Sequence, residues 1–294
     1  MKWKYAYVAV LSLSMTCAML SMSQCTNNSN EVEKPVVTWW LFGDSHVGHR
    51  FYNDQLSRAI DDVNELAVSD FAICLGDCID ERGLQPDWHG DHPLVEWENF
   101  VRVMDDLNHD RTYILGNHDN DGREPPVNPV AEPNYFTQMV NGVRIIAISD
   151  EHLDEDYVTD LEMSQEQRDW FKGILKSDPD IPTIIMSHQD PAGLARENPR
   201  STIPFFHEWL EPRLDEFRIV LWVSAHAHNW YLAENAGGHS FTHLILDSIL
   251  YEEQSAFMTI DNKGDSPVIT LRFRDHGKKE WISVEGHDEY VITW

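Results

Sequence analysis

The sequence predicts an α/β fold, and three of its features lead to this class. Short apolar segments alternate along the chain with longer segments of helical periodicity. The apolar segments are rich in β-branched and aromatic residues, as expected of strands buried on both faces. Residues 229–294 instead show the turn signals and alternating pattern of β-hairpins. Strands that alternate with helices indicate α/β layers, beside which the hairpins add an antiparallel sheet.

The strands and helices can be placed in order along the chain. The predicted strands are 36–42, 71–75, 112–115, 143–149, 183–186 and 219–223. The predicted helices are 54–66, 93–107, 164–176 and 204–217. Ser164 and Gln167 have the spacing of a capping box, which marks the start of the third helix. Trp39 and Trp40 are neighbours in the first strand, so one is expected on each face of its sheet. Hairpin turns are expected at 237–238, 262–264 and 275–277.

Composition and charge exclude several classes of protein. The chain has 294 residues, of which 42% are hydrophobic and eleven are tryptophan, so it is too apolar for a disordered tail. It carries 50 acidic and 22 basic residues, a formal net charge of −28. A wide nucleic-acid-binding face requires a surplus of basic residues, so the charge disfavours a long nucleic acid as partner. Without a linker, repeat or composition break after Pro35, residues 35–294 are expected to form one domain.

Residues 1–24 have the pattern of a signal peptide. Lys2 and Lys4 precede an apolar stretch, residues 6–20, that is shorter than a bilayer-spanning helix requires. We therefore expect an exported protein, periplasmic or at the cell surface.

The residues after the apolar stretch leave the mode of attachment open. Ser21-Met22-Ser23 offers a small-x-small cleavage site. Cys25 opens a polar tether, residues 25–34, and resembles the lipidated cysteine of bacterial lipoproteins, although Gln24 before it is a poor match to that signal. The two alternatives are therefore cleavage at the small-x-small site without an anchor, and membrane attachment through a lipidated Cys25.

Two cysteines, Cys74 and Cys78, remain in the predicted domain. A disulfide between them is one interpretation, and two small buried thiols is the one that we favour.

Five of the six predicted strands lead into residues of the types that bind metal ions. In chain order these residues are Asp44, His46, Asp77, Asn117, His118, Asp119, His188, His226 and His228. Ligand sites in α/β sheets lie at the carboxyl ends of strands, so these side chains are expected to converge. Asp, Asn and His together suit zinc, manganese or iron better than calcium. Seven ligands from among these nine residues suffice for two ions if one carboxylate bridges the ions. Gly43, Gly76 and Gly116 precede three of the groups and permit tight turns and close backbone approach.

This ordered series resembles the calcineurin-like metallophosphoesterase superfamily. The series runs from residue 43 to residue 228, and five blocks in the same order make the match specific. The resemblance implies a four-layer αββα sandwich with antiparallel hairpins at the C-terminus. It also implies a centre of two divalent or trivalent metal ions, either Mn, Fe or Zn.

The resemblance further implies a role for each position. Asp44, His46 and His228 would hold the first ion, Asn117, His188 and His226 the second, and Asp77 would bridge them. His118 would face the substrate and protonate the leaving oxygen or stabilise developing charge, with Asp119 orienting its ring. A hydroxide that bridges the two ions would attack phosphorus in line, with no covalent enzyme intermediate.

The chain departs from the family pattern at two positions. Ala225 stands where the last block usually has a glycine, which changes no ligand. Asp80 stands where purple acid phosphatases have a metal-binding tyrosine, which disfavours that subgroup.

We therefore expect an exported two-metal hydrolase that cleaves phosphate monoesters or diesters of a small molecule. The alternative is a non-catalytic, metal-stabilised surface binding protein on the same fold, and His118 favours the enzyme because a binding module needs no such acid. Trp88 and Trp230 are candidates to stack on the substrate. His49 and His89 each follow a metal block and are candidate members of the site.

Overall fold

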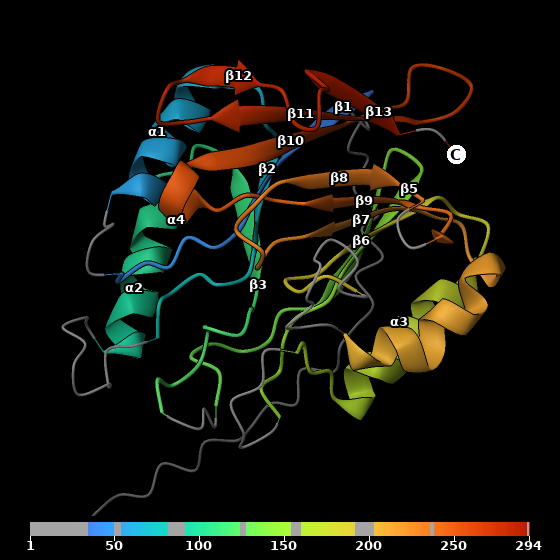
Figure 1. Cartoon of the computed structure of the whole chain (residues 1–294), viewed down its shortest axis with the longest axis horizontal. Coiled ribbons are helices and arrows are strands. Elements are labelled where there is room, and N and C mark those ends of the chain that lie inside the picture. The colour runs from blue at the N-terminus through green and yellow to red at the C-terminus, as the bar shows by residue number, and fades with distance from the viewer. Residues whose placement is uncertain are drawn as a thin grey trace, which may run out of the picture. The chain divides into compact units, whose positions relative to one another are not determined.

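Two β-sheets packed face to face form the centre of the computed structural model, and helices cover both outer faces (Figure 1). The structure describes residues 35–49, 54–81, 92–123, 128–153, 160–191, 203–235, 238–292 and 294. The expected signal peptide and polar tether, residues 1–34, lie outside these ranges. Among the residues described, none belongs to a helix of the length and apolarity that a membrane span requires.

The first sheet has seven strands in the order β12-β11-β10-β1-β2-β3, with β13 beside β11. Their bounds are β1 (Val36–Phe42), β2 (Phe71–Leu75), β3 (Asp110–Ile114), β10 (Gln254–Asp261), β11 (Val268–Asp275), β12 (Glu280–Ile282) and β13 (Glu289–Ile292). Strands β1, β2 and β3 are parallel, whereas β10 pairs with β1 in the antiparallel sense and begins the antiparallel half. The carboxyl ends of β1, β2 and β3 therefore lie at one edge.

The second sheet has six strands in the order β4-β5-β6-β7-β9-β8. Their bounds are β4 (Phe136–Val140), β5 (Val143–Ala147), β6 (Thr183–Met186), β7 (Ile219–Ser224), β8 (Tyr231–Glu234) and β9 (Thr242–Ile245). The four central strands are parallel, and β4 and β8 pair with their neighbours in the antiparallel sense.

The predicted α/β class and the C-terminal hairpins are confirmed, and all six predicted strands are present. The hairpin strands do not form a sheet of their own, however. Strands β10 to β13 extend the first sheet, and β8 and β9 extend the second. Strand β4 was not predicted, because three of its five residues are exposed and its sequence shows no continuous apolar run.

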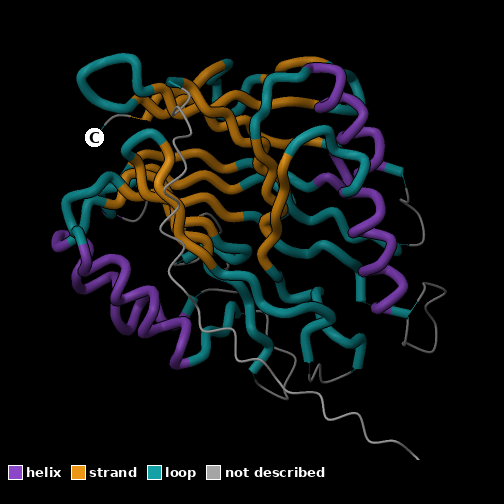
Figure 2. Tube along the Cα trace, turned by 180° about the vertical axis from the view of Figure 1, so that it is seen from behind, coloured by secondary structure: helices purple, strands orange, loops and turns teal. Residues whose placement is uncertain are grey.

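Helices α1 (Gln55–Leu66) and α2 (Pro93–Met104) cover the first sheet, and α3 (Gln165–Ser177) covers the second (Figure 2). The helix predicted over 204–217 is a π-helical turn, η2 (Phe206–Leu210), followed by a 3₁₀ helix, η3 (Glu211–Glu216). Pro212 accounts for this change, because its nitrogen has no hydrogen to donate within a regular α-helix.

The capping box at the start of α3 is half formed. The Ser164 hydroxyl accepts a hydrogen bond from the Gln167 backbone N–H at 3.2 Å. The Gln167 side chain does not complete the box, because its amide bonds both the N–H and the carbonyl of Ser149, at 3.0 and 2.9 Å. Gln167 therefore ties α3 to the segment that follows β5.

Three buried apolar clusters account for the four layers of the predicted αββα sandwich. One lies between the sheets, one between the first sheet and α1 and α2, and one between the second sheet and α3. Trp39 belongs to the first cluster and Trp40 to the second, so the two rings lie on opposite faces of β1 as predicted. Cys74 and Cys78 are buried free thiols, with their sulfur atoms 3.6 Å apart.

A buried polar network joins α1 to the antiparallel half of the first sheet. The Arg274 guanidinium donates two hydrogen bonds to the Asp62 carboxylate, both at 2.8 Å. His276 Nδ1 lies 2.8 Å from Asp62 Oδ2, and His276 Nε2 lies 2.6 Å from the Ser255 hydroxyl. All four side chains are buried.

The network shifts the pKa values of its members. Burial alone would raise the pKa of Asp62, but the hydrogen bonds from Arg274 and His276 lower it well below its ordinary value. Burial lowers the pKa of His276, despite the attraction of Asp62.

We predict that acid weakens the fold through this network. Because the pKa of His276 is lowered in the folded state, the unfolded chain takes up this proton first, and stability falls as the pH drops below the ordinary histidine value of 6.5. The lowered pKa of Asp62 adds a loss in the same direction at still lower pH. One proton contributes at most about 1.4 kcal/mol per pH unit. Urea unfolding between pH 7 and 5 in the presence of a chelator measures this slope. We expect a shallower slope for His276→Gln than for wild type or for the exposed control His287→Gln, and equal slopes would contradict the prediction.

Candidate metal centre

The predicted metal ligands lie in loops at the carboxyl ends of strands from both sheets. Asp44 and His46 follow β1, Asp77 follows β2, Asn117 follows β3, His188 follows β6, and His226 and His228 follow β7. The loops of the first sheet are bonded to each other, because the N–H groups of Asp44 and His46 each donate to a carbonyl of the loop after β2 at 3.0 Å.

One group of ligand atoms contains Asp44, His46, Asp77 and His228, all within 4.8 Å of one another. His228 Nε2 lies 2.9 Å from Asp44 Oδ1 and 3.3 Å from His46 Nε2. His46 Nε2 in turn lies 3.6 Å from Asp77 Oδ2. Two carboxylates and two imidazoles in this arrangement can hold one borderline cation.

A second group contains Asp77, His188 and His226, again within 4.8 Å. His188 Nε2 lies 3.1 Å from Asp77 Oδ2 and 3.2 Å from His226 Nδ1. Asn117 lies next to this group, because the following N–H, that of His118, donates to Asp77 Oδ1 at 2.9 Å. Asn117 Oδ1 is buried and accepts no hydrogen bond from any residue that the structure describes, as expected of an oxygen that binds a cation. Asp77 is thus common to two sets of ligands.

The His188 ring is oriented for a ligand. Its Nδ1 lies 2.7 Å from the carbonyl oxygen of Leu75, which can only accept a hydrogen bond. The proton therefore belongs on Nδ1, and Nε2 faces the Asp77 carboxylate. Ligating histidines in metalloproteins are fixed in this way by a second hydrogen bond.

The charges at the centre also fit a cation. Burial alone would raise the pKa of Asp77, but the neighbouring rings of His188, His118 and His46 lower it well below its ordinary value. Burial would lower the pKa of His188, but Asp77 and Asp44 raise it to about 10. The carboxylates are therefore ionised and draw positive charge into a buried site. A metal ion would supply that charge in place of the proton.

The backbone of the ligands is strained. Asp44, His46, Asp77, His226 and His228 have positive φ angles, between 41° and 61°, which is the left-handed region that residues with a β-carbon seldom adopt. Such strain persists where the surrounding structure enforces it, and it concentrates at functional sites.

Glycines let the loops approach closely. A β-carbon on Gly116 would lie 2.5 Å from Asp77 Oδ1, and one on Gly76 would lie 2.7 Å from His188 Nδ1. A β-carbon on Gly43 would lie 2.7 Å from that of Ala225, the residue that departs from the family pattern. The substitution at Ala225 is therefore compatible with the site because residue 43 is glycine.

His118 lies at the edge of the first group, and its ring makes an edge contact with His46 at 4.7 Å between centroids. Its Nδ1 lies 3.3 Å from the Asp80 carbonyl oxygen and 3.8 Å from Glu81 Oε1. These contacts do not match the expectation that Asp119 orients the His118 ring.

Asp119 holds the loops instead. Its two oxygens accept hydrogen bonds from the backbone N–H groups of Ile79 and Gly116, at 3.1 and 2.8 Å. Burial and the charge of Asp77 raise the pKa of Asp119 to about 8. Asp119 therefore fixes the positions of two loops that carry ligands.

Two residues of the site were missed by sequence reasoning. Asp80 Oδ1 lies 3.4 Å from His46 Nδ1, so a buried carboxylate borders the ring of a predicted ligand, and its spacing of three from Asp77 could have indicated this. Tyr251, in the short helix α4 (Ile249–Glu252), lies beside His228, and no signal in the sequence marked it.

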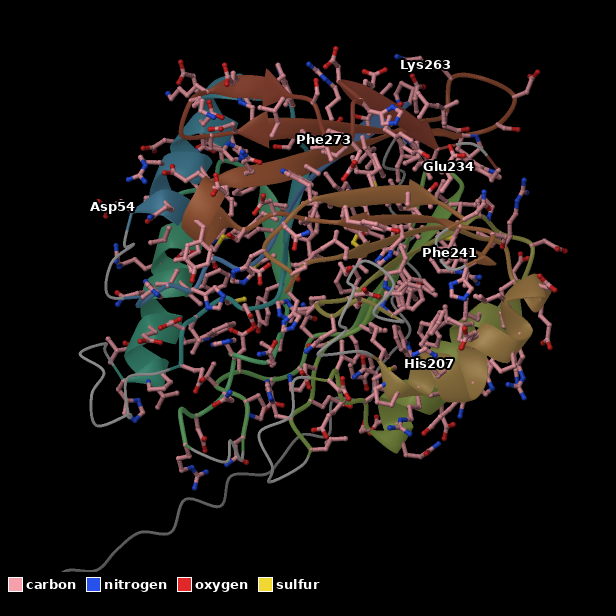
Figure 3. The ribbon with its side chains drawn as sticks, viewed as in Figure 1. Asp54, His207, Glu234, Phe241, Lys263 and Phe273 are labelled. Carbon is pink, nitrogen blue, oxygen red and sulfur yellow. The ribbon has the colours of Figure 1, made fainter. Side chains whose placement is uncertain are left out.

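One of the two candidate stacking tryptophans, Trp230, lies among the residues that the structure describes. The Trp230 ring packs 5.2 Å from Phe273, which lies in the core between the sheets (Figure 3), and its Nε1 donates to Gln254 Oε1 at 2.6 Å. Trp230 is therefore a packing residue, and the hypothesis that it stacks on a substrate is not supported. Trp88 and His89 lie outside the described residues, whereas His49 is buried, with its ring 6.4 Å from that of Tyr251.

The profile of the calcineurin-like phosphoesterase family matches residues 37–230. The chain belongs to this family. The matched region contains every predicted metal ligand, so the resemblance noted in the sequence is confirmed. None of the curated proteins compared with the chain matches it.

Solved structures show the same fold as this calcineurin-like phosphoesterase. A dimetal phosphatase from Danio rerio superposes with a TM-score of 0.62 at 14% identity, over 88% of this chain and 99% of that one. The purple acid phosphatase PPD1 from yellow lupin gives 0.57 at 12% identity, over 88% and 54%. GAP50, the anchor in the inner membrane complex of Plasmodium, gives 0.56 at 15% identity, over 88% and 89%. At these identities the likeness establishes the αββα fold and not the substrate.

We predict that Gly43 and Ala225 depend on each other. Gly43→Ala places two β-carbons 2.7 Å apart, and overpacking of this kind costs about 1–3 kcal/mol. We expect Gly43→Ala to lower the unfolding midpoint and the number of bound manganese ions. The second substitution Ala225→Gly removes the clash, so the double variant should recover both properties. Thermal unfolding with metal analysis checks this, and a double variant as damaged as the single one would show that another constraint acts at Gly43.

Proposed function

We propose that this phosphoesterase uses two metal ions to hydrolyse phosphate monoesters or diesters of small molecules. The observation that carries the proposal is that Asp77 belongs to two groups of potential ligands at once. A shared carboxylate is what a centre of two adjacent ions requires. The two groups accommodate Mn, Fe or Zn, since all three accept imidazole and carboxylate ligands.

Each side chain has a defined part in this proposal. Asp44, His46 and His228 would hold the first cation, Asn117, His188 and His226 the second, and Asp77 both. When bound, the two cations would supply Lewis-acid activation of the attacking water and would neutralise the phosphoryl oxygens. The Asp80 carbonyl keeps a proton on His118 Nδ1. With Nδ1 held in this way, the imidazolium form of His118 carries its second proton on Nε2, and that is the proton it would pass to the leaving oxygen.

Charge limits the choice of substrate. The net charge of −28 repels long polyanions, whereas two cations at the strand ends would attract a single phosphate group. A small phosphate ester fits this balance better than a long nucleic acid.

We propose in addition that the protein acts outside the cytoplasm. The basic residues and the apolar stretch within residues 1–24 support export, and Cys25 with its polar tether supports a lipid anchor. The enzyme would then meet substrates in the periplasm or at the cell surface.

A non-catalytic, metal-stabilised surface binding protein is the second candidate. The similarity in fold to the Plasmodium anchor favours its inclusion, because a fold alone does not imply catalysis. His118 separates the candidates, since its position beside the ligands is useful to an enzyme and has no purpose in a binding module.

We predict that Asp77→Asn abolishes a metal-dependent activity. With manganese present, the wild-type chain should hydrolyse p-nitrophenyl phosphate, a monoester, or bis-p-nitrophenyl phosphate, a diester, and should bind about two ions. Loss of the shared carboxylate should lower the rate at least about 10²-fold and reduce the ions bound per chain. Rate assays and elemental analysis give both values, with the exposed Asp265→Asn as a matched control. Full activity in Asp77→Asn would refute the two-metal proposal, and bound metal without turnover in the wild type would favour the binding protein.

We predict different effects for His118 and Asp119. His118→Asn should lower kcat about 10²- to 10⁴-fold, the usual contribution of a general acid, without changing the metal content or the unfolding midpoint. Asp119→Asn weakens the acceptor of two backbone N–H groups, so it should lower the unfolding midpoint more than His118→Asn does. Kinetics, metal analysis and thermal unfolding of the two variants compare them. Loss of a metal ion in His118→Asn would instead make His118 a ligand.

A further inference from the structure

We propose that Tyr251 determines specificity, and that the natural phosphoester carries a planar aromatic group that packs on the Tyr251 ring. This inference rests on the proposed function and names the class of its substrate. It starts from the one exposed aromatic ring that, among the residues the structure describes, contacts a predicted metal ligand.

The Tyr251 ring borders the candidate metal centre. Its centroid lies 5.3 Å from that of His228, at an interplanar angle of 49°. It also lies 6.4 Å from that of His49, at 78°. Tyr251 is 49% exposed, whereas His49 is buried. A half-exposed apolar ring therefore stands next to a ligand of the first cation.

The backbone holds Tyr251 in register with the ligands. The N–H of Leu250 donates to the carbonyl of Asp44 at 3.1 Å, and the N–H of Ile249 donates to that of Gly43 at 3.3 Å. The N–H of Tyr251 itself is capped by the Ser248 hydroxyl at 3.1 Å. Ile249 and Leu250 are buried, so they anchor the short helix α4. The position of the Tyr251 ring is thereby tied to the first metal ligand.

The rings around Tyr251 favour a flat partner. Aromatic groups prefer offset stacking on one ring together with edge contacts from others. The inclined ring of His228 beside Tyr251 is partly exposed and provides an edge for such a contact, whereas the buried ring of His49 packs against Tyr251. A base or aryl group on Tyr251 would lie beside His228, close enough for a short linker to join it to a phosphoryl group at the cations. Stacking of a base on an aromatic side chain strengthens binding by about one to two orders of magnitude.

The test compares two ligands that differ only in an aromatic group. Adenosine 5′-monophosphate and ribose 5-phosphate share the phosphate and the sugar, and only the first has a base. Each is used as a competitor of p-nitrophenyl substrate hydrolysis by the full chain with manganese, which gives an inhibition constant whether or not the competitor is itself cleaved. The variants are Tyr251→Ala, Tyr251→Phe and the control Val291→Ala, whose side chain is also exposed.

We expect the wild type to bind adenosine 5′-monophosphate more tightly than ribose 5-phosphate. Tyr251→Ala should raise the inhibition constant of adenosine 5′-monophosphate about 10-fold and change that of ribose 5-phosphate less than about 2-fold. Tyr251→Phe keeps the ring and should behave as wild type, as should Val291→Ala.

Three results would overturn the inference. An equal loss for both ligands would indicate a contact with sugar or phosphate, or a distorted site. No loss for either would show that the ring is not used, and a loss in Tyr251→Phe equal to that in Tyr251→Ala would assign the effect to the hydroxyl. The proposed function is tested separately, by the loss of metal-dependent hydrolysis that is expected in Asp77→Asn. If the wild type cleaves neither p-nitrophenyl substrate, that function fails, and calorimetric binding of the same two ligands to the manganese-loaded chain still decides the role of Tyr251.

Discussion

Pairs of carboxylate and imidazole groups that join the two sheets are the interaction on which the centre depends. Asp44 and Asp77 come from loops of the first sheet, and their partners His228 and His188 come from loops of the second, at 2.9 and 3.1 Å. A buried carboxylate is unfavourable unless a positive charge compensates it. The ends of the two sheets must therefore meet for either pair to form, and the centre exists only in the complete sandwich.

Close packing of backbone makes this meeting possible. Glycine at residues 43, 76 and 116 brings loops of different strands within van der Waals distance, and the left-handed backbone of Asp44 and Asp77 turns their side chains into the shared space. The left-handed backbone conformations are unfavourable in themselves, and the packing of the rest of the fold enforces them. Asp119 contributes by fixing the loops after β2 and β3 to one another.

Much of the fold and of the candidate site could be predicted from the sequence. Buried parallel strands form continuous apolar runs, and the candidate ligands follow directly after these runs. The candidate ligands from Asp44 to His228 were identified in this way, and the structure brings them together. The sequence did not predict which of the two sheets each C-terminal strand joins. That depends on pairing between strands that are far apart in the sequence, as between β1 and β10. Strand β4 lacks an apolar run, and Tyr251 lies in a helix too short to show periodicity. The contacts of His118 and Asp119 could not be predicted, because adjacency in the sequence does not fix where a side chain points.

The division of ligands between the sheets has a thermodynamic consequence. An unfolded chain keeps His226 close to His228 but separates both from Asp44 by more than 180 residues. A cation would therefore find the whole predicted ligand set only in the native state. Mass action then makes the free energy of unfolding increase with the logarithm of the metal concentration above the dissociation constant. The supply of transition metals around the protein would therefore determine how long the folded state persists, as well as how much of the protein is active.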